Sequence, residues 1–377
     1  MHCYRGRDPI TLQHLEVEVD GGAITAVRPW LEPSGDLWLA AGLVDLQVNG
    51  YGGIDLNADG CDVAAITRML EVAGTTTFLP TIITADIASM SSRLRAIANA
   101  CAGNSDVARA IPCIHVEGPY ISPEDGYRGA HPVADVRPPS LEEFDVLQSA
   151  ADGLIGLVTL SPHWPGVEEF IRALHERGVV VSLGHTDASP DQIHHAVDAG
   201  ATLSTHLGNG LAAVLPRHNN PIFTQLAEDR LTAAFIVDGA HLPTDTLRVM
   251  LRAKGVERSI LVSDSVALGG VTPGHYHSHI GGEVTVHADG TIRMREGGLL
   301  AGSRIMLKDA VGRMSTMSGC TLGQAIRMAT SNPADALGLK AGRIVVGAPA
   351  DLLLFRWKRG DTSLQVEEVV IRGEQLA

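Results

Sequence analysis

The stretch Gly42-Leu-Val-Asp-Leu-Gln-Val-Asn-Gly50 is a short apolar run that ends in two amides, Gln47 and Asn49. From here the sequence repeats one unit, in which an apolar strand is followed by a polar residue and then by an amphipathic helix. Eight such strands are expected near residues 43–49, 75–83, 110–117, 154–160, 179–184, 201–206, 231–238 and 259–264. This repetition predicts the α/β class and a closed, parallel, TIM-like (β/α)8 barrel.

Helix-end signals between the strands support this repeat. Residues 189–200, Ser-Pro-Asp-Gln-Ile-His-His-Ala-Val-Asp-Ala-Gly, begin with a capping serine and a first-turn proline and stop at a glycine. The pattern that starts at Val63 likewise stops at Gly74, which is typical of a C-cap. Each expected strand is therefore followed by a helix that can return the chain to the start of the next strand.

The two ends of the chain depart from this repeat. Leu15-Glu-Val-Glu-Val-Asp20 alternates apolar and polar residues, Gly21-Gly22 predicts a turn, and Ile24 begins a second strand. From Arg343 to Phe355 the chain again reads as strand. Because a hairpin alone is not stable, we expect residues 1–41 and 343–377 to form one small β-sandwich domain. Residues 42–342 would then form the catalytic barrel.

Two long insertions interrupt the barrel pattern. Residues 118–139 form a Gly/Pro-rich loop, and residues 275–298 read as an antiparallel ribbon that turns at Ala288-Asp-Gly290. Loops of this length inside a compact domain are usually functional. We therefore expect both insertions to lie near the active face of the barrel.

Composition limits the class of partner. The chain has 377 residues, is 45% hydrophobic and carries a formal net charge of −14, which argues against nucleic acid and anionic membranes as partners. It has no apolar run long enough to span a membrane and no signal-peptide pattern at its start. The five cysteines are scattered and form no C-x-x-C pair. We expect reduced thiols and a cytoplasmic protein.

Three polar residues at strand ends suggest a metal site. Glu117, His185 and His206 each end an apolar run, and one carboxylate with two imidazoles can hold a catalytic divalent metal while leaving a position open for water. In a barrel, the C-terminal strand ends meet at one mouth. The polar side chains expected at that mouth are Gln47, Asn49, Glu117, His185, His206, Asp238 with His241, and Asp264.

These motifs, taken in order, resemble the N-acetylglucosamine-6-phosphate deacetylase family of the amidohydrolase superfamily. The resemblance covers nearly the whole chain. Its motifs are Ile114-His-Val-Glu-Gly-Pro, Gly129-Ala-His131, Leu183-Gly-His-Thr-Asp, Thr205-His-Leu-x-Asn209, Asp238-Gly-x-His241, Leu261-Val-Ser-Asp264 and Leu300-Ala-Gly-Ser. Each is weak alone, and the set is specific.

The resemblance implies roles for the catalytic residues. Glu117, His185 and His206 would be the metal ligands, and Asp264 would be the general acid and base. His131 would help to polarise the acetamide carbonyl of the substrate. These roles suit amide hydrolysis, because a metal polarises the carbonyl and acidifies water while a carboxylate moves the proton.

The resemblance also implies a sugar-binding half of the site. His241 and the backbone around Asn209 and Gly210 would hold the sugar and its 6-phosphate. Arg217, 11 residues after His206, would reach the phosphate of the partner subunit in a homodimer. Its context, Leu215-Pro-Arg-His-Asn-Asn, and the glycine at 208 differ from the usual family pattern. An unphosphorylated or differently linked N-acetyl amino sugar therefore stays open as the substrate.

The first strand favours a single metal. Many amidohydrolases carry His-x-His there and bind a second ion, whereas this chain has Gln47-Val-Asn49. Amides are poor zinc ligands beside imidazole, so we expect Gln47 and Asn49 near water or substrate. The expected cofactor is one divalent metal per subunit, with zinc favoured and iron, cobalt or manganese possible.

Other histidines are expected to be structural. His115 should lie in the barrel interior with hydrogen-bond partners, and His194-His195 should lie on a helix surface. His275, His277 and His279 alternate on the ribbon and could chelate a metal, but a solvated edge strand is favoured.

Two other functions compete with deacetylation. D-aminoacylase-like and dihydroorotase-like enzymes often carry a carboxylated lysine after strand four, where this chain reads Leu160-Ser-Pro-His163. A metal-free barrel that only binds sugar is the non-enzyme alternative. The absence of a lysine there counts against those enzymes. Metal analysis separates the sugar-binding barrel from an enzyme, because only the barrel would keep its ligand binding with a metal content near zero.

Overall fold

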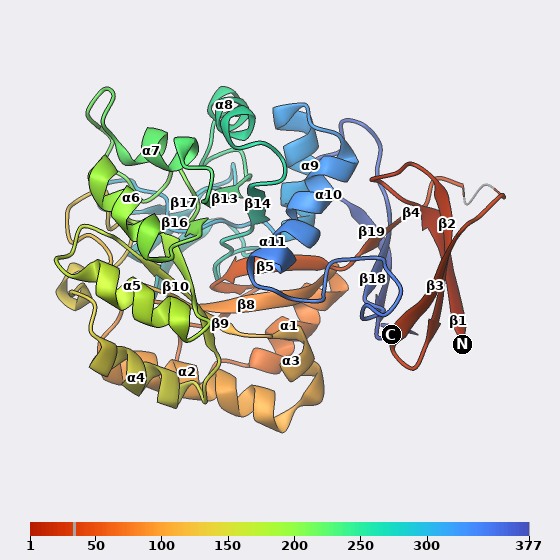
Figure 1. The fold of residues 1–377 in the computed structure, drawn as a ribbon, viewed down its shortest axis with the longest axis horizontal. Coiled ribbons are helices and arrows are strands. Elements are labelled where there is room, and N and C mark those ends of the chain that lie inside the picture. Colours follow the sequence, from red (N-terminus) through yellow and green to blue (C-terminus); the bar gives the residue numbers. More distant parts are fainter. Residues whose placement is uncertain (33–34, 377) are drawn as a thin grey trace.

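The computed structural model describes residues 1–32 and 35–376. Figure 1 shows two parts side by side, a large barrel wrapped by helices on the left and a smaller sheet on the right that contains both chain termini. The barrel is built from the central part of the sequence, and the small sheet is built from its two ends. The predicted (β/α)8 barrel with a small β-sandwich is confirmed.

The barrel sheet has eight strands in sequential order within the described residues, and all neighbouring pairs with a recorded register are parallel. Every expected strand is present, although several are shorter than predicted. The polar residues that follow these strands leave the ladder and turn into the barrel mouth. The strands are β5 (Leu43–Val48), β8 (Thr75–Ile83), β9 (Ile114–Glu117), β10 (Ile155–Leu160), β11 (Val180–Leu183), β12 (Leu203–Ser204), β13 (Thr232–Ile236) and β14 (Ser259–Val262).

The first and last strands meet and close the barrel. The backbone N–H of Asp264 donates to the carbonyl oxygen of Gln47 over 3.0 Å, and Val48 forms a parallel bridge with Ser265. This closure brings the end of β5 beside the end of β14. Gln47 and Asp264 therefore share the barrel mouth, although 217 positions separate them in the sequence.

Helices surround the barrel and bury their apolar stripes against it (Figure 1). The expected helix over 189–200 is confirmed, because Ser189 and Gln192 form a capping box and Gly200 ends the helix. The helices are α1 (Val63–Val72), α2 (Ile87–Gly103), α3 (Ser105–Ala110), α4 (Leu141–Ala150), α5 (Val167–Glu176), α6 (Pro190–Ala199), α7 (Pro221–Ala227), α8 (Thr244–Lys254), α9 (Leu307–Ser318), α10 (Leu322–Met328) and α11 (Ser331–Ala336).

The termini form one mixed sheet that folds back over its own small core. Its order is β20-β19-β18-β4-β1-β2-β3, so the N-terminal strand β4 pairs directly with the C-terminal strand β18. An isolated bridge from Ala23 to Pro349 returns the edge of the sheet to the C-terminal segment. The strands are β1 (His2–Arg7), β2 (His14–Asp20), β3 (Ala23–Pro29), β4 (Trp38–Ala41), β18 (Leu352–Arg356), β19 (Gln365–Ile371) and β20 (Glu374–Gln375).

One expectation about this sheet is wrong. The C-terminal strand was expected to begin at Arg343, but regular pairing begins at Leu352. Gly347 and Ala348 instead make backbone hydrogen bonds across to β3, with Gly347 donating to Ile24 and Ala348 accepting from it. A turn at residues 346–347 interrupts the segment, and Pro349 has no N–H to donate to a continuous ladder.

The two insertions both lie over the barrel mouth. Residues 118–139 form a loop after β9 with one short 3-10 turn, Val133–Asp135. The ribbon consists of three antiparallel strands, β15 (Gly274–Ser278), β16 (Gly282–Val286) and β17 (Ile292–Met294), and it turns between β16 and β17 as expected. A second small ribbon, β6 (Gly50–Tyr51) with β7 (Ile54–Asp55), follows the first barrel strand.

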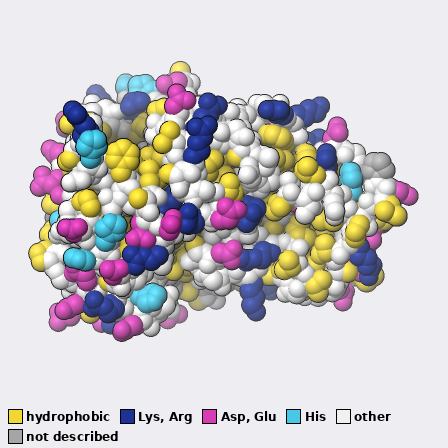
Figure 2. Space-filling view, turned by 45° about the horizontal axis from the view of Figure 1, so that its top comes forward, with side chains coloured by type: hydrophobic (Ala, Val, Ile, Leu, Met, Phe, Trp, Pro, Cys, Tyr) yellow, Lys and Arg dark blue, Asp and Glu magenta, His cyan; other side chains and the backbone are white. Residues whose placement is uncertain are grey.

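The surface is polar and of mixed charge. In Figure 2, acidic and basic side chains are interspersed, and most of the visible histidines lie over the barrel end at the left. No helix among the described residues is long and apolar enough to cross a membrane. The five cysteines form no disulfide.

Candidate active site

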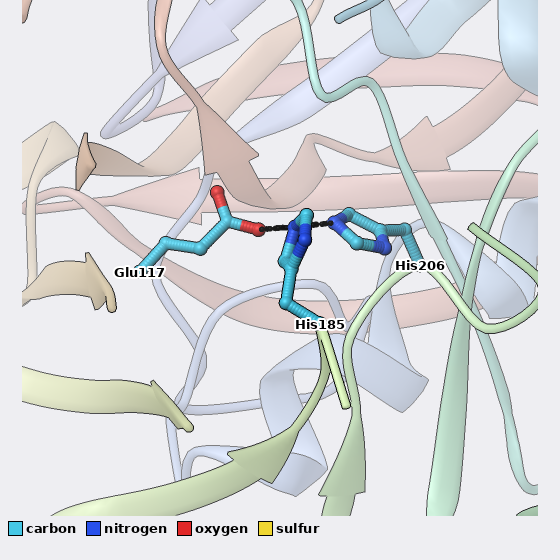
Figure 3. Close-up of side chains that lie close together, drawn as sticks. All are labelled: Glu117, His185 and His206. Atoms are coloured by element: carbon cyan, nitrogen blue, oxygen red, sulfur yellow. Dashed lines mark hydrogen bonds and ion pairs between the residues drawn. The ribbon is translucent and has the colours of Figure 1, made fainter. Parts of the chain in front are cut away.

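Three strand ends bring Glu117, His185 and His206 together in the barrel mouth (Figure 3). Nε2 of His206 lies 3.0 Å from Oε1 of Glu117 and 3.1 Å from Nε2 of His185. Nε2 of His185 lies 3.3 Å from the same carboxylate oxygen. All three side chains are buried. The residues that the sequence placed at separate strand ends thus form one compact cluster.

The backbone is strained where it presents these side chains. His185, His206 and Asp264 have φ values of +49°, +27° and +46°, in or near the left-handed region that side chains other than glycine seldom adopt. Each follows a barrel strand, so the turn aims its side chain inward. Strained backbone of this kind tends to persist where the surrounding structure and the function require it.

Neighbouring groups fix the ring of His185. Its Nδ1–H donates to the carbonyl oxygen of Tyr127 over 2.8 Å, which leaves Nε2 as the ring nitrogen that faces the cluster. Gly210 and Gly129 pack against the same ring. A Cβ at Gly210 would lie 2.6 Å from Nδ1 of His185. The absence of a side chain at Gly210 therefore leaves room for the ring of His185.

The cluster fits a divalent metal. Tetrahedral bonds of about 2.1 Å place neighbouring ligand atoms about 3.4 Å apart, close to the spacings of 3.0, 3.1 and 3.3 Å seen here. Burial raises the pKa of Glu117, but hydrogen bonds from His185 and His206 outweigh burial and hold that pKa well below its usual range. The carboxylate is therefore charged and ready to bind a cation.

The two amides of the first strand face the carboxylates of the site. Nε2 of Gln47 donates to Oε1 of Glu117 over 3.0 Å, and Nδ2 of Asn49 donates to Oδ1 of Asp264 over 2.8 Å. Both amides are buried. They present their nitrogens to the carboxylates of the site, a contact that the sequence did not predict.

Asp264 lies in the same cavity, with its side chain buried opposite Asn49. Burial, followed by the negative charge of Glu117, raises the pKa of Asp264 to about 8. A cation held by Glu117 would act in the opposite direction, because it adds positive charge nearby. A carboxyl group whose pKa can be set near neutrality suits proton transfer.

His131 completes this end of the cavity. Its Nδ1 lies 2.8 Å from the hydroxyl of Thr84, and its ring stands edge-on to His185 with centroids 4.5 Å apart. Burial, followed by the proximity of His185, lowers the pKa of His131 to about 3. The imidazole is therefore neutral. Sequence reasoning identified His131 but gave no signal for Thr84, which lies in a different βα loop.

The cavity has a volume of about 320 Å³ and extends from the cluster toward two loops. Asn209, Gly210 and His241, which the resemblance assigns to sugar binding, are among the residues that line it. Nδ1 of His241 lies 2.7 Å from a carboxylate oxygen of Asp238, which orients the ring. Arg217 is not among the residues that line the cavity, and its position in the loop is exposed.

The ribbon adds lining residues that the sequence did not identify. Arg293, Gly298 and Leu299 also line the cavity. Only the length of the insertion indicated such a contribution, because no motif marks these residues.

The remaining histidines lie outside the cluster. His115 is buried in the barrel, with Nε2 2.8 Å from the hydroxyl of Thr159, as predicted. His277 pairs with Glu283 and His279 with Asp55, each over 3.0 Å. In the described part of the chain, only Glu117, His185 and His206 form a group able to hold a metal. His194 and His195 are exposed on α6, as expected.

Known proteins are similar to this chain in sequence and in architecture. Residues 38–376 match the amidohydrolase family. The chain is 32% identical to N-acetylglucosamine-6-phosphate deacetylase of Bacillus subtilis, over 86% of this chain and 82% of the relative. It is 30% identical to N-acetylgalactosamine-6-phosphate deacetylase of Escherichia coli, over 99% and 98%.

Solved structures agree with this match. A mutant N-acetyl-D-glucosamine-6-phosphate deacetylase from Mycobacterium smegmatis, in complex with N-acetyl-D-glucosamine-6-phosphate, superposes with a TM-score of 0.89 at 28% identity, covering 100% of this chain and 99% of that one. N-acetylglucosamine-6-phosphate deacetylase from Thermotoga maritima gives 0.88 at 29%, covering 100% and 98%. The chain belongs to the N-acetylglucosamine-6-phosphate deacetylase family of the amidohydrolase superfamily.

Proposed function

We propose that this protein hydrolyses the acetamide of N-acetylglucosamine 6-phosphate and releases glucosamine 6-phosphate and acetate. One observation carries the proposal: a buried Glu117/His185/His206 cluster shares a cavity with the buried carboxyl group of Asp264. Amide hydrolysis needs an electrophilic centre and a proton carrier side by side. Membership of the amidohydrolase family supports the reaction class.

Glu117, His185 and His206 would hold one divalent metal, for which we propose zinc, with iron, cobalt or manganese as alternatives. A metal bound there would supply Lewis acidity toward the acetamide carbonyl and toward water. Gln47 donates to Glu117 and Tyr127 accepts from His185, so both ligands are held in place by neighbours.

Asp264 is the proposed general base and general acid. It would take a proton from the attacking water and return it to the departing nitrogen, which makes the amine a better leaving group. Asn49 holds the carboxyl through a 2.8 Å hydrogen bond and so sets its orientation. His131, neutral and fixed by Thr84, would contact the acetamide carbonyl oxygen.

The identity of the sugar in the substrate is a separate part of the proposal. Asn209, Gly210 and His241 are proposed to bind the sugar, and Arg217 is proposed to reach a phosphate from the partner subunit of a homodimer. N-acetylgalactosamine 6-phosphate is a specific second candidate. The N-acetylgalactosamine-6-phosphate deacetylase of Escherichia coli aligns with 99% of the chain. The N-acetylglucosamine-6-phosphate deacetylase of Bacillus subtilis aligns with 86% of it. An unphosphorylated N-acetyl amino sugar is the third candidate.

We also propose a division of the chain and a location for it. Residues 1–41 and 343–377 would form the small domain and residues 42–342 the catalytic domain, with the protein acting in the cytoplasm. The pairing of β4 with β18 supports this division, because it joins both chain ends outside the barrel.

The test is a deacetylation assay on the zinc-loaded protein, with release of free amine as the signal. The substrates are N-acetylglucosamine 6-phosphate, N-acetylgalactosamine 6-phosphate and N-acetylglucosamine, compared by kcat/KM. We expect the first to be hydrolysed best. Absence of turnover with all three, in protein that holds its metal, would refute the proposal. Sugar binding by metal-free protein without turnover would favour the sugar-binding barrel.

A further inference from the structure

The ribbon brings a positive charge to the cavity. Arg293, on β17, lines the cavity together with Gly298 and Leu299. Among the described residues that line this cavity, it is the sole arginine or lysine. The same cavity is also lined by the carboxyl-bearing residues Glu117 and Asp264. The cavity lining therefore combines acidic groups with one permanent cation.

The guanidinium of Arg293 is held in position. Its NH1 donates to the carbonyl oxygen of Gly298 over 2.9 Å, across a hairpin in which Arg293 and Leu300 form a bridge. Ile292, next to it in sequence, is buried beneath the ribbon in a cluster with Val266. The strand that carries Arg293 is thus fixed to the barrel by its apolar face.

Arg293 forms no close ion pair. No carboxylate oxygen of the described chain lies within 4.0 Å of its guanidinium nitrogens, and Asp289 acts on it only through longer-range electrostatics. Arg295, two residues later, lies 3.6 Å from Glu283. A guanidinium has five donor N–H groups, and one hydrogen bond occupies NH1 of Arg293. Donors therefore remain for a ligand, in the fork geometry that suits phosphate.

We propose that Arg293 recognises the anionic group of the substrate from within the same chain and so acts as a specificity-determining residue. This inference rests on the proposed function for the class of substrate, a phosphorylated N-acetylhexosamine. In a chain with a net charge of −14, an anionic ligand needs a local cation. Arg217 is exposed and does not line the cavity of its own chain, whereas Arg293 does.

His241 provides a second donor in the same cavity. Its Nδ1 is engaged by Asp238 over 2.7 Å, so Nε2 is the ring nitrogen left for a ligand. Arg293 and His241 come from the ribbon and from the loop after β13, respectively. An anionic group placed between them would be contacted by donors from both elements.

The experiment compares Arg293→Ala, Arg293→Lys and Arg217→Ala in the zinc-loaded enzyme, with Arg295→Ala as the matched control. Arg295 lies on the same ribbon and is half-exposed, but it does not line the cavity. Two quantities are measured: KM and kcat for N-acetylglucosamine 6-phosphate and N-acetylglucosamine, and the Kd of glucosamine 6-phosphate by calorimetry.

We expect Arg293→Ala to raise KM for the phosphorylated substrate, and Kd for glucosamine 6-phosphate, by about tenfold or more. Kinetics with N-acetylglucosamine should not change, Arg293→Lys should recover part of the loss, and Arg295→Ala should behave as wild type. Equal KM and Kd in Arg293→Ala and wild type would overturn the inference and leave the proposed function intact. A loss confined to Arg217→Ala would also overturn it.

The binding measurement separates this inference from the proposed reaction. If wild type binds glucosamine 6-phosphate without deacetylating either sugar, weaker binding by Arg293→Ala still supports the inference while the proposed function fails. If wild type neither binds nor hydrolyses a phosphorylated sugar, both are overturned.

Discussion

The two halves of the cavity are built differently. One half consists of strand-end residues Glu117, His185, His206 and Asp264, all buried and joined by contacts of 2.8–3.3 Å to one another or to Gln47 and Asn49. The other half consists of loop and ribbon residues such as Asn209, Arg293 and Leu299, which are half-buried or exposed. Hydrogen-bonded strands position the first half, and side-chain packing of insertions positions the second.

This difference separates reaction type from substrate choice. A parallel barrel brings the ends of its strands to one face, so the chemistry there depends only on which residues follow the strands. The loop half can change in length and residue type without disturbing the barrel. We therefore expect changes in the first half to abolish hydrolysis and changes in the second to alter substrate preference.

The largest effect should come from the metal cluster. His206→Ala removes one ligand, and we expect kcat to fall by about a thousandfold or more, because several kcal/mol of charge stabilisation are lost. The control is His195→Ala, an exposed histidine on α6, which should keep full activity. Metal content is measured with the kinetics. Full activity in metal-depleted His206→Ala protein would show that the cluster is not catalytic.

Asp264→Asn should lower kcat by about a hundredfold to ten-thousandfold while the metal stays bound, since proton transfer is lost and the ligands are not. The kinetics are read beside metal stoichiometry and a circular dichroism spectrum. Asparagine retains the size of the side chain and can still contact Asn49. Unchanged kcat in metal-loaded Asp264→Asn would remove this residue from the mechanism.

Gly210→Ala tests the contact between the loop half of the cavity and the ring of His185 in the strand-end half. The new Cβ would lie 2.6 Å from Nδ1 of His185, so the ring must move, and we expect metal affinity and activity to fall by about ten- to a hundredfold. Gly60→Ala is the matched control, because Gly60 has a similar φ of +71° but nothing within 4 Å of its Cβ position. It should cost about 1 kcal/mol of stability and no activity. Equal activity losses would mean that backbone strain, and not contact with His185, causes the effect.

The smallest effect should come from the ribbon histidines. His277 is largely exposed and pairs with an exposed Glu283, a type of interaction that contributes about 0–1 kcal/mol. We expect His277→Ala to leave metal content at one ion per subunit and kcat/KM within about twofold of wild type. Loss of a second metal ion from this variant would instead show that the ribbon chelates metal.

Sequence reasoning predicted the strand-end half well. The periodic pattern located all eight barrel strands, and the polar residue after each strand is set by the local sequence. Glu117, His185 and His206 could be grouped because the topology of a parallel barrel is repetitive. His115 could be separated from them because it lies inside a strand and not at its end.

The loop half could not be derived in the same way. Arg293 reaches the cavity because the ribbon folds back over the barrel mouth, a long-range arrangement with no periodic signal in sequence. The partner of His131, Thr84, and the partner of His185, Tyr127, are also contacts between loops. The C-terminal strand was predicted to start too early. The residues from Arg343 onward are hydrophobic, but regular strand pairing begins only at Leu352.

The left-handed φ angles of His185, His206 and Asp264 lower the stability of the fold at three residues that the proposed hydrolysis requires. In metal-free protein, glycine at any of these positions would relieve about 1–2 kcal/mol of backbone strain. A laboratory evolution experiment that selects for heat resistance alone would therefore tend to discard these side chains. A selection for product formation would retain them. The two selections would therefore favour different residues at the same three positions.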